Sequence, residues 1–302
     1  MPLPYRWQVR VERWKSLFRG SGPQQPRPKL CPSCGALVGI SATRCHECGT
    51  SLRFSMAAAS KHLSGVFSGP APVTSLILVA NILMFGVTWL ATIRAGGKGG
   101  FSILWGANVE ALYRLGMVWK PAIEEGEWYR LVTAMFLHGG LLHIGMNMMS
   151  LMNLAPALEE LYGSARFLFL YVFTGAFGFL VSAFNPFTTH PTVGASGALL
   201  GLVGAMIAVT TRRGGAYMRA LRSQLISSVV ILLLVGIAIP IVDNWAHGGG
   251  FVAGFVLGKI FADREPLNPR ERNVAYLLGW IAGLAVIASF AFMILRYNQP
   301  LQ

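Results

Sequence analysis

Long apolar runs separated by short polar segments dominate the chain from residue 73 onward. Each run is close to the ~20 residues that a helix needs to cross about 30 Å of hydrocarbon. The predicted membrane spans are 73–93, 141–159, 166–184, 192–210, 224–242, 245–262 and 274–295. The stretch 94–140 mixes charged residues with aromatic residues of the kind that favour a membrane interface, and we expect a partly embedded helical loop there. The pattern predicts an all-α, polytopic membrane bundle of seven spans.

The composition agrees with this pattern. Apolar residues make up 54% of the chain and charged residues only 12%, against about 25% charged residues in ordinary soluble domains. A soluble core helix has no need of apolar runs this long. The chain is therefore expected to be an integral membrane protein.

The predicted organisation has five parts. They are a basic segment 1–30, a cysteine module 31–52, a linker 53–72, a membrane core 73–262 and an additional C-terminal span 274–295. Segment 1–30 could form an amphipathic helix on the membrane surface or a disordered basic tail, and the sequence favours neither. It has no apolar core of a signal peptide, so we expect the amino terminus to stay in the cytoplasm.

The distribution of charge supports this orientation. Residues 1–62 hold ten Lys or Arg and two acidic residues, and loop 211–223 holds four Arg and no acid. Such loops face the cytoplasm, where anionic lipid attracts them. A basic segment can also bind nucleic acid, but contact with the lipid bilayer is the more common role. The lack of a transit-like amino terminus favours a bacterial-type plasma membrane over an organelle.

All four cysteines lie in the module 31–52, as two Cys-x-x-Cys pairs: Cys31, Cys34, Cys45 and Cys48. Each pair places two thiolates on one turn, and two such turns close a tetrahedral zinc site. The module resembles a zinc ribbon, and we expect a structural zinc. A redox-active pair is the alternative, which the presence of two equivalent pairs disfavours. A cytoplasmic partner of the ribbon cannot be identified from the sequence.

Polar residues inside membrane spans are costly and therefore suggest function. His143, Asn147, Ser196 and His247 lie in the second, fourth and sixth spans, each within the first two turns. These spans run in the same direction, so the four side chains are expected at one depth near the outer surface. Taken singly, each has an ordinary structural explanation, such as helix packing or an interhelical hydrogen bond.

Glycine patterns give Ser196 and His247 a reason to meet. Gly197 and Gly201 form a small-residue face on the fourth span, and Gly250, Gly254 and Gly258 form another on the sixth. Such faces let two helices approach closely. The expected result is a hydrogen bond between the histidine and the serine, which would make the serine a nucleophile. The serine also lies at a helix start, where free N–H groups can stabilise an oxyanion.

The chain resembles rhomboid intramembrane proteases over about residues 73–262. The motifs that carry the resemblance are Glu127-Trp128-Tyr129-Arg130, His143-x-x-x-Asn147, Glu159-x-x-x-Gly163, Gly194-x-Ser196-Gly197, and His247 with its glycine face. The seventh span resembles that of the six-plus-one subgroup.

The resemblance implies a dyad in which Ser196 attacks the substrate carbonyl and His247 accepts the proton. It implies an oxyanion hole made by His143, Asn147 and the Ser196 N–H. It also implies that Trp128, Arg130 and Glu159 have structural roles. Leu200 departs from the aromatic residue that many relatives carry there, so the orientation of His247 needs another explanation. Asp243, four residues before His247, is one candidate.

The implied function is cleavage of transmembrane protein substrates near the outer interface, with no catalytic cofactor. Two other functions are open. A non-proteolytic relative that escorts membrane proteins would usually lack the serine or the histidine. A proton-coupled transporter would be expected to carry intramembrane carboxylates or internal repeats.

Overall fold

The computed structural model describes residues 29–31, 36–39, 42–49, 52, 71–96, 106–188, 190–239 and 241–299. The chain divides into two compact units, Met1–Gly65 and Val66–Gln302, each described by itself. Three of the features expected from the sequence lie outside the described residues: the amphipathic segment before residue 29, most of the linker 53–72, and Cys34.

The smaller unit contains a two-stranded antiparallel sheet. Strand β1 (Lys29–Leu30) pairs with β2 (Leu37–Val38). Val38 packs with Cys31 and Cys45 in a small buried cluster. So small a cluster buries little apolar surface, and a unit of this size usually needs a metal or a disulfide for stability.

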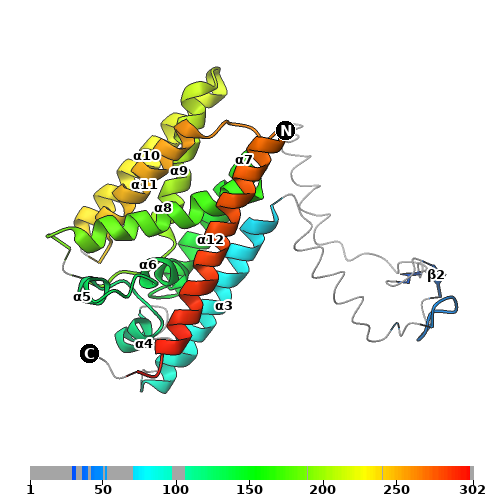
Figure 1. Cartoon of the computed structure of the whole chain (residues 1–302), viewed down its shortest axis with the longest axis horizontal. Coiled ribbons are helices and arrows are strands. Elements are labelled where there is room, and N and C mark those ends of the chain that lie inside the picture. The colour runs from blue at the N-terminus through cyan, green and yellow to red at the C-terminus, as the bar shows by residue number, and fades with distance from the viewer. Residues whose placement is uncertain are drawn as a thin grey trace, which may run out of the picture. The chain divides into compact units, whose positions relative to one another are not determined.

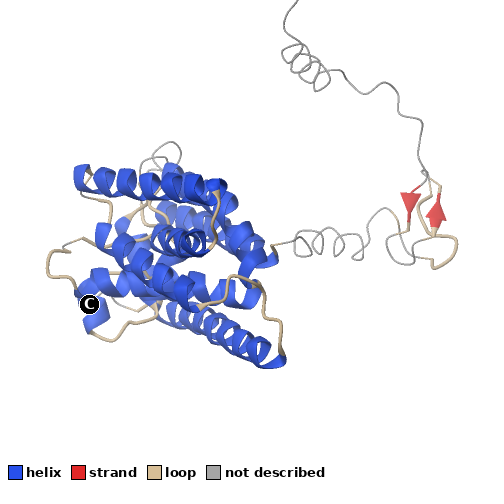
Figure 2. Ribbon diagram, turned by 90° about the horizontal axis from the view of Figure 1, so that it is seen from above, coloured by secondary structure: helices blue, strands red, loops and turns tan. Residues whose placement is uncertain are grey.

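The named elements of the larger unit are all helices, and the strands in Figure 2 belong to the smaller unit. Its long helices are α3 (Pro72–Arg94), α7 (Leu141–Tyr162), α8 (Ser164–Phe184), α9 (Ser196–Arg212), α10 (Ala216–Ala238), α11 (Asn244–Ile260) and α12 (Pro269–Arg296). Figure 1 shows α12, in red, crossing the front of the unit and ending beside α4.

Five of the described helices are long and apolar enough to cross a bilayer: α3, α7, α8, α10 and α12. Helix α9 is apolar but has only 17 residues, and α11 has 17 residues as well. The protein is therefore an integral, multi-pass membrane protein with an all-α membrane unit. Two of the seven expected spans are shorter than the length usually needed for a crossing.

Four expected boundaries differ from the helix ends by four residues or more. Besides the two starts described next, α10 ends at Ala238 rather than at 242, and α12 begins at Pro269 rather than at 274. Helix α9 begins at Ser196 rather than at residue 192, because Thr192 pairs through its backbone with Val118 in an extended bridge. Helix α10 begins at Ala216 rather than at 224, so much of the expected loop 211–223 is helical. Hydropathy alone cannot locate these boundaries, because the same residues near the end of a span can be either helical or extended.

Residues 106–137 form the expected helical loop between the first two long helices. It contains α4 (Val109–Arg114), α5 (Lys120–Glu124), α6 (Arg130–Thr133) and the 3-10 helix η2 (Ala134–Phe136). Arg130 in α6 is almost fully buried. A buried guanidinium must be hydrogen-bonded, and this one is held by the loop itself.

Glu159, near the C-terminal end of α7, connects this helix to the starts of α3 and α8. Its buried carboxylate accepts hydrogen bonds from the backbone N–H groups of Val73 and Thr74, at 2.9 and 2.7 Å, and from the hydroxyls of Thr74 and Ser164, at 2.8 and 2.6 Å. The carboxylate thus satisfies donors at the start of α3 and of α8 that their own helices leave unpaired. This agrees with a structural role for Glu159.

Candidate active site

The candidate site forms where the first turns of α7, α9 and α11 meet. Helices α9 and α11 are parallel, since the side chain of Arg212 at the C-terminal end of α9 donates to the carbonyls of Lys259 and Phe261 at the end of α11. At their N-terminal ends lie Ser196, the first residue of α9, and His247, the fourth residue of α11.

The structure brings Ser196 and His247 together. The Nε2 atom of His247 lies 2.7 Å from the Ser196 Oγ. His247 is 4% exposed, whereas Ser196 is half-buried, so the serine side of this hydrogen bond is the more accessible one. A histidine nitrogen at this distance can take the proton of a serine hydroxyl.

Close packing of α9 and α11 explains the contact, and the expected glycine faces are confirmed. A methyl group added at Gly250 would overlap the carbonyl oxygen of Gly197, and one at Gly254 would overlap that of Gly201. The two backbones touch along the whole interface, which no larger side chain would permit. The position of His247 relative to Ser196 is therefore fixed by the approach of the two backbones.

His143 lies against the turn that precedes Ser196. Gly194 has a φ of +130°, and a methyl group there would come within 2.7 Å of the His143 ring and 3.7 Å of the Ser196 Oγ. The Nδ1 atom of His143 faces the Gly139 N–H at 3.4 Å. A neutral ring that accepts at Nδ1 carries its proton at Nε2, the nitrogen beside Gly194.

Asn147 lies one turn after His143 on α7. Its side-chain nitrogen donates to the His143 carbonyl at 2.9 Å, and the side chain is almost fully buried. An amide nitrogen carries two N–H groups, so one remains for a ligand. Asn147 and His143 thus have donors available on the same face of α7.

Asp243 does not hold the His247 ring. One of its carboxylate oxygens accepts from the backbone N–H groups of Trp245 and Ala246, and the other accepts from the Ser182 hydroxyl at 2.6 Å. The idea that Asp243 orients the ring directly was therefore wrong. It caps the N-terminus of α11, as an aspartate in that position commonly does. Among the described residues, the Nδ1 of His247 has no hydrogen-bond partner.

Helix α8 supplies a constraint on His247 that the sequence reasoning missed. The carbonyl of Ala246, directly before His247, lies against Gly178 of α8, where an added methyl group would overlap it, and 3.4 Å from the methyl position of Gly197. Ser182 of α8 holds Asp243. The start of α11 is thus held from two sides, by α8 and by α9, which fixes the backbone that carries the His247 ring. The signal in the sequence was Gly178, which with Gly175 and Ser182 forms a set of small residues in the predicted span 166–184.

His138 packs next to His143, with ring centroids 5.0 Å apart in an edge-on arrangement, and is fully buried. Burial and the neighbouring His143 lower its pKa to about 3, so the ring is neutral at physiological pH. Its contact is with the ring of His143 rather than with Ser196, which fits a structural role.

Three of the four cysteines are described, and they lie together. The sulfur atoms of Cys31, Cys45 and Cys48 are all within 4.8 Å of one another, and those of Cys31 and Cys48 are 3.6 Å apart. Two sulfurs on one tetrahedral zinc, with Zn–S distances near 2.3 Å, would be about 3.8 Å apart. A three-cysteine cluster of this kind could bind a metal.

Comparison with known proteins identifies similar chains. A rhomboid domain matches residues 125–264. The chain is similar to Rhomboid protease GluP of Bacillus subtilis, with 34% identity over 194 residues, covering 64% of this chain and 35% of that protein. It is also similar to RHOMBOID-like protein 5 of Arabidopsis thaliana, with 40% identity over 174 residues and 56% of each chain covered.

The Putative rhomboid protease YdcA of Bacillus subtilis is 32% identical over 163 residues, which cover 54% of this chain and 78% of that protein. The chain spans about a third of GluP and about half of RHOMBOID-like protein 5.

The fold and the site define a polytopic helical membrane protein with a serine and a histidine paired inside the bundle. The matched domain covers the helices that carry both residues, and YdcA is matched over most of its length. The chain belongs to the rhomboid family.

Proposed function

We propose that this protein is an intramembrane serine endopeptidase that cleaves transmembrane proteins near the outer face of the membrane. The observation that carries the proposal is the 2.7 Å distance between the Ser196 Oγ and the His247 Nε2. Membership of the rhomboid family, two of whose matched bacterial members are named as proteases, supports the same reaction.

In this mechanism Ser196 is the nucleophile and His247 the general base. The Ser196 Oγ attacks the scissile carbonyl carbon while its proton passes to the His247 Nε2. The tetrahedral intermediate collapses when His247 gives that proton to the leaving nitrogen, and an acyl-enzyme remains. Water then attacks the acyl carbon with His247 again as base, which releases the second product and restores the serine.

The oxyanion of each tetrahedral intermediate needs nearby N–H donors. The candidates are the backbone N–H of Ser196, the Nε2–H of His143 and the free side-chain N–H of Asn147. The proximity of His143 to Gly194, and the placement of Asn147 one turn further along α7, support this set. Donors that are already in place when charge develops stabilise the transition state without reorganisation.

The outward location of the site rests on the orientation of the helices. In the proposed topology all seven long helices cross the membrane, with the amino terminus in the cytoplasm of a bacterial-type plasma membrane. Arg212, Arg213 and Arg264 lie at the ends of α9 and α11 remote from Ser196. Basic residues favour the cytoplasmic side, which leaves the dyad near the outer surface, where water can reach it.

For the amino-terminal unit we propose a zinc ribbon over residues 31–52, joined by the linker 53–72 to a protease core at 73–262, with 274–295 as an additional span. Cys31, Cys45 and Cys48 would be zinc ligands, and Cys34 would supply the fourth thiolate. The spacing of the three described sulfurs supports such a site. The zinc would be structural and would take no part in peptide cleavage.

A cleavage assay tests the proposed reaction. The purified full-length protein is incubated with a fluorogenic transmembrane peptide, in parallel with Ser196→Ala and His247→Ala. We expect cleavage by the wild type and a loss of at least about a thousand-fold in each variant, because the nucleophile and its base act as a unit.

Cleavage that survives either substitution would contradict the dyad. Equal inactivity of all three proteins, with a range of transmembrane peptides, would favour a non-proteolytic role. Thermal unfolding of each variant in detergent serves as the control for correct folding.

A further inference from the structure

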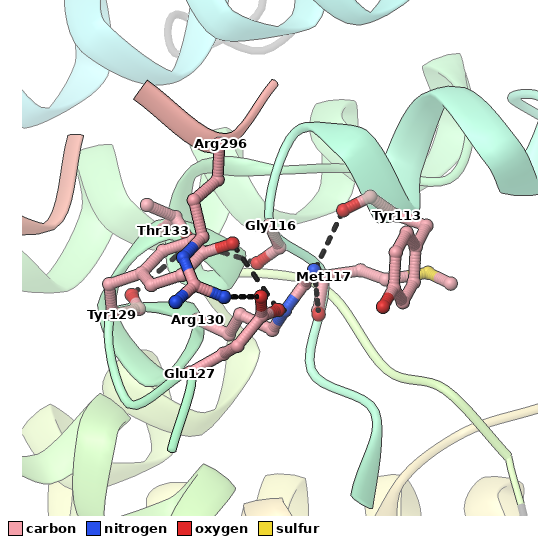
Figure 3. Close-up of polar contacts among 8 residues, drawn as sticks. All are labelled: Tyr113, Gly116, Met117, Glu127, Tyr129, Arg130, Thr133 and Arg296. Atoms are coloured by element: carbon pink, nitrogen blue, oxygen red, sulfur yellow. Dashed lines mark hydrogen bonds and ion pairs between the residues drawn. The ribbon is translucent and has the colours of Figure 1, made fainter. Parts of the chain in front are cut away.

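The C-terminal end of α12 forms an ion pair with the loop that precedes the candidate site. The guanidinium of Arg296 donates to one carboxylate oxygen of Glu127, and Arg130 donates to the other (Figure 3). The side chain of Glu127 is only 11% exposed. A single carboxylate therefore joins α12 to α6, with the Arg296 side chain itself 47% exposed.

Arg130 carries this connection into the loop. Its Nη1 donates to the carbonyls of Tyr113 and Met117, at 2.7 and 3.1 Å, and its guanidinium lies 4.2 Å from the centre of the Tyr113 ring (Figure 3). Arg130 is 3% exposed, so these partners replace water in stabilising its buried positive charge. The contacts fix the backbone of the turn 113–117.

The residue after Met117 pairs with the segment that leads to Ser196. Val118 and Thr192 exchange backbone hydrogen bonds of 3.1 and 2.9 Å, and the N–H of Gly194 donates to the carbonyl of Ala134 at 2.9 Å. Ser196 follows two residues later. The path from Arg296 to this segment consists of consecutive hydrogen bonds and one peptide link.

We propose that Arg296 is a positioning residue for the active site, through which α12 sets the placement of the Thr192–Gly194 segment and thus of Ser196 and its oxyanion-binding N–H. The inference rests on the proposed protease function. It assigns α12, which contributes no residue to the site itself, a role in the reaction.

The packing of α12 supports a specific contact at this end of the helix. Most of α12 is exposed on the outside of the unit. One face of α12 is nevertheless buried along the helix, at Ala275, Ala282 and Ser289. Its last turns continue this contact: Phe290 packs against Phe136 with ring centroids 5.4 Å apart, Met293 is buried, and Arg114 donates to the carbonyl of Tyr297 at 3.2 Å. The helix therefore meets the loop closely where Arg296 reaches Glu127.

The titration of Glu127 gives a second readout. Burial raises the pKa of Glu127, but the hydrogen bonds and charges of Arg130 and Arg296 lower it, so that it lies below its ordinary value of 4.5. The hydroxyl of Tyr129 also faces the carboxylate at 3.4 Å. A group with a lowered pKa stabilises the fold above its ordinary pKa, and this contribution is lost as the pH falls through the lowered value. Removing Arg296 lets the pKa rise, so the contact with Arg130 fails at a higher pH.

The experiment compares full-length Arg296→Gln and Arg296→Lys with the wild type on a transmembrane peptide. Arg272→Gln is the matched control, because Arg272 is exposed at the other end of α12 and pairs with no carboxylate in the described part of the chain. We expect Arg296→Gln to lower kcat about 2- to 30-fold, the range of a moderate coupling between sites, with KM within about two-fold of the wild type. Arg296→Lys should recover much of the loss, and Arg272→Gln should behave as the wild type.

Two further measurements test the route from Arg296 to the site. The loss of thermal stability at acid pH should begin at a higher pH in Arg296→Gln, with no such shift in Arg272→Gln. Hydrogen exchange of the Val118 and Thr192 amides should become faster in Arg296→Gln, while amides in the middle of α9 keep their rates.

An unchanged kcat in Arg296→Gln would overturn the inference, as would a loss that Arg296→Lys does not restore. Unchanged exchange at Val118 and Thr192 would also overturn it, and this result is obtained whether or not the protein cleaves the peptide. Failure of the wild type to cleave any peptide would instead count against the proposed function. The two failures are therefore distinguishable.

Discussion

At the scale of the residue, the site has a histidine that can accept the serine proton, but no described residue accepts a hydrogen bond from the other nitrogen of that histidine. Ser196 is paired with His247, whose Nδ1 finds no hydrogen-bond partner among the described residues. Asp243 is close in sequence but its carboxylate is occupied by the N-terminus of α11 and by Ser182. The ring is thus positioned by packing and by its bond to the serine, rather than by a carboxylate.

Asn147 allows a test of the oxyanion hole without touching the dyad. Replacing Asn147 with Ala removes one of the proposed donors, and we expect kcat to fall about 100-fold while KM changes little, as for loss of a donor that acts only in the transition state. Steady-state kinetics on a transmembrane peptide measure the effect. Asn147 also donates to the His143 carbonyl, so thermal unfolding must show an intact fold. Wild-type kcat in the folded variant would remove Asn147 from the oxyanion hole.

Much of the site could be predicted at this scale. Ser196, His247, His143 and Asn147 are the polar residues that stand out in apolar spans, and the glycines beside them indicate close helix approach. The contacts of Asp243 could not be predicted, because an aspartate four residues before a histidine fits both a helix cap and a partner for the ring. Only the position of Ser182 on α8 decides between these. The link from Glu127 to Arg296 spans 169 residues in sequence, and no local pattern indicates it.

At the scale of the element, the interface between α9 and α11 governs the geometry of the site. The carbonyls of Gly197 and Gly201 occupy the space where side chains at Gly250 and Gly254 would project. Packing this close suits membrane helices, whose association relies on van der Waals contact more than on the hydrophobic effect. Small residues here therefore determine both stability and the distance between Ser196 and His247.

Gly254→Ala tests this interface with a single methyl group. The added group would overlap the carbonyl of Gly201, and we expect a destabilisation of about 1–3 kcal/mol, typical of overpacking, together with a loss of cleavage as α11 moves away from α9. The matched control is Gly283→Ala in α12, where an added methyl group meets nothing within 4 Å. Thermal unfolding in detergent and the peptide assay measure the two effects. Equal behaviour of the two variants would contradict the close-packing account.

Hydropathy predicted all seven long helices in the right order, because apolar runs of about 20 residues usually form membrane helices. It misplaced the start of α9, since the segment around Thr192 is held extended by pairing with Val118, a residue far away in sequence. It also could not reveal that α9 and α11 have only 17 residues. Helix ends are set by caps and by tertiary contacts that a composition window does not contain.

At the scale of the whole molecule, the chain combines a membrane unit that carries the site with a small cysteine unit. The sequence predicted both, because Cys-x-x-Cys pairs and long apolar runs are each distinctive patterns. The described cysteine sulfurs lie close enough to share a metal ion. This arrangement predicts that the full-length protein binds a metal ion, which metal analysis can measure.

Metal analysis of the purified full-length protein tests the ribbon. We expect about one zinc per chain, lost on Cys45→Ser, because removing one of four thiolates from a structural site strongly weakens binding. Ser196→Ala is the matched control and should keep its zinc, since it leaves the cysteine unit unchanged. Less than about half an equivalent in the wild type, or full retention in Cys45→Ser, would contradict a zinc site formed by these cysteines.

The central claim is that Ser196 is a nucleophile activated by His247, and the most direct measurement is covalent labelling. The full-length protein is treated with a fluorophosphonate, from which an activated serine oxygen displaces fluoride to form a stable phosphonate ester. Mass spectrometry of the digested protein locates the adduct. We predict modification of Ser196 in the wild type, no modification in Ser196→Ala, and labelling at least about 100-fold slower in His247→Ala, since a serine without its base is a weak nucleophile. An adduct on a different serine, or labelling of Ser196 at the same rate without His247, would contradict the account.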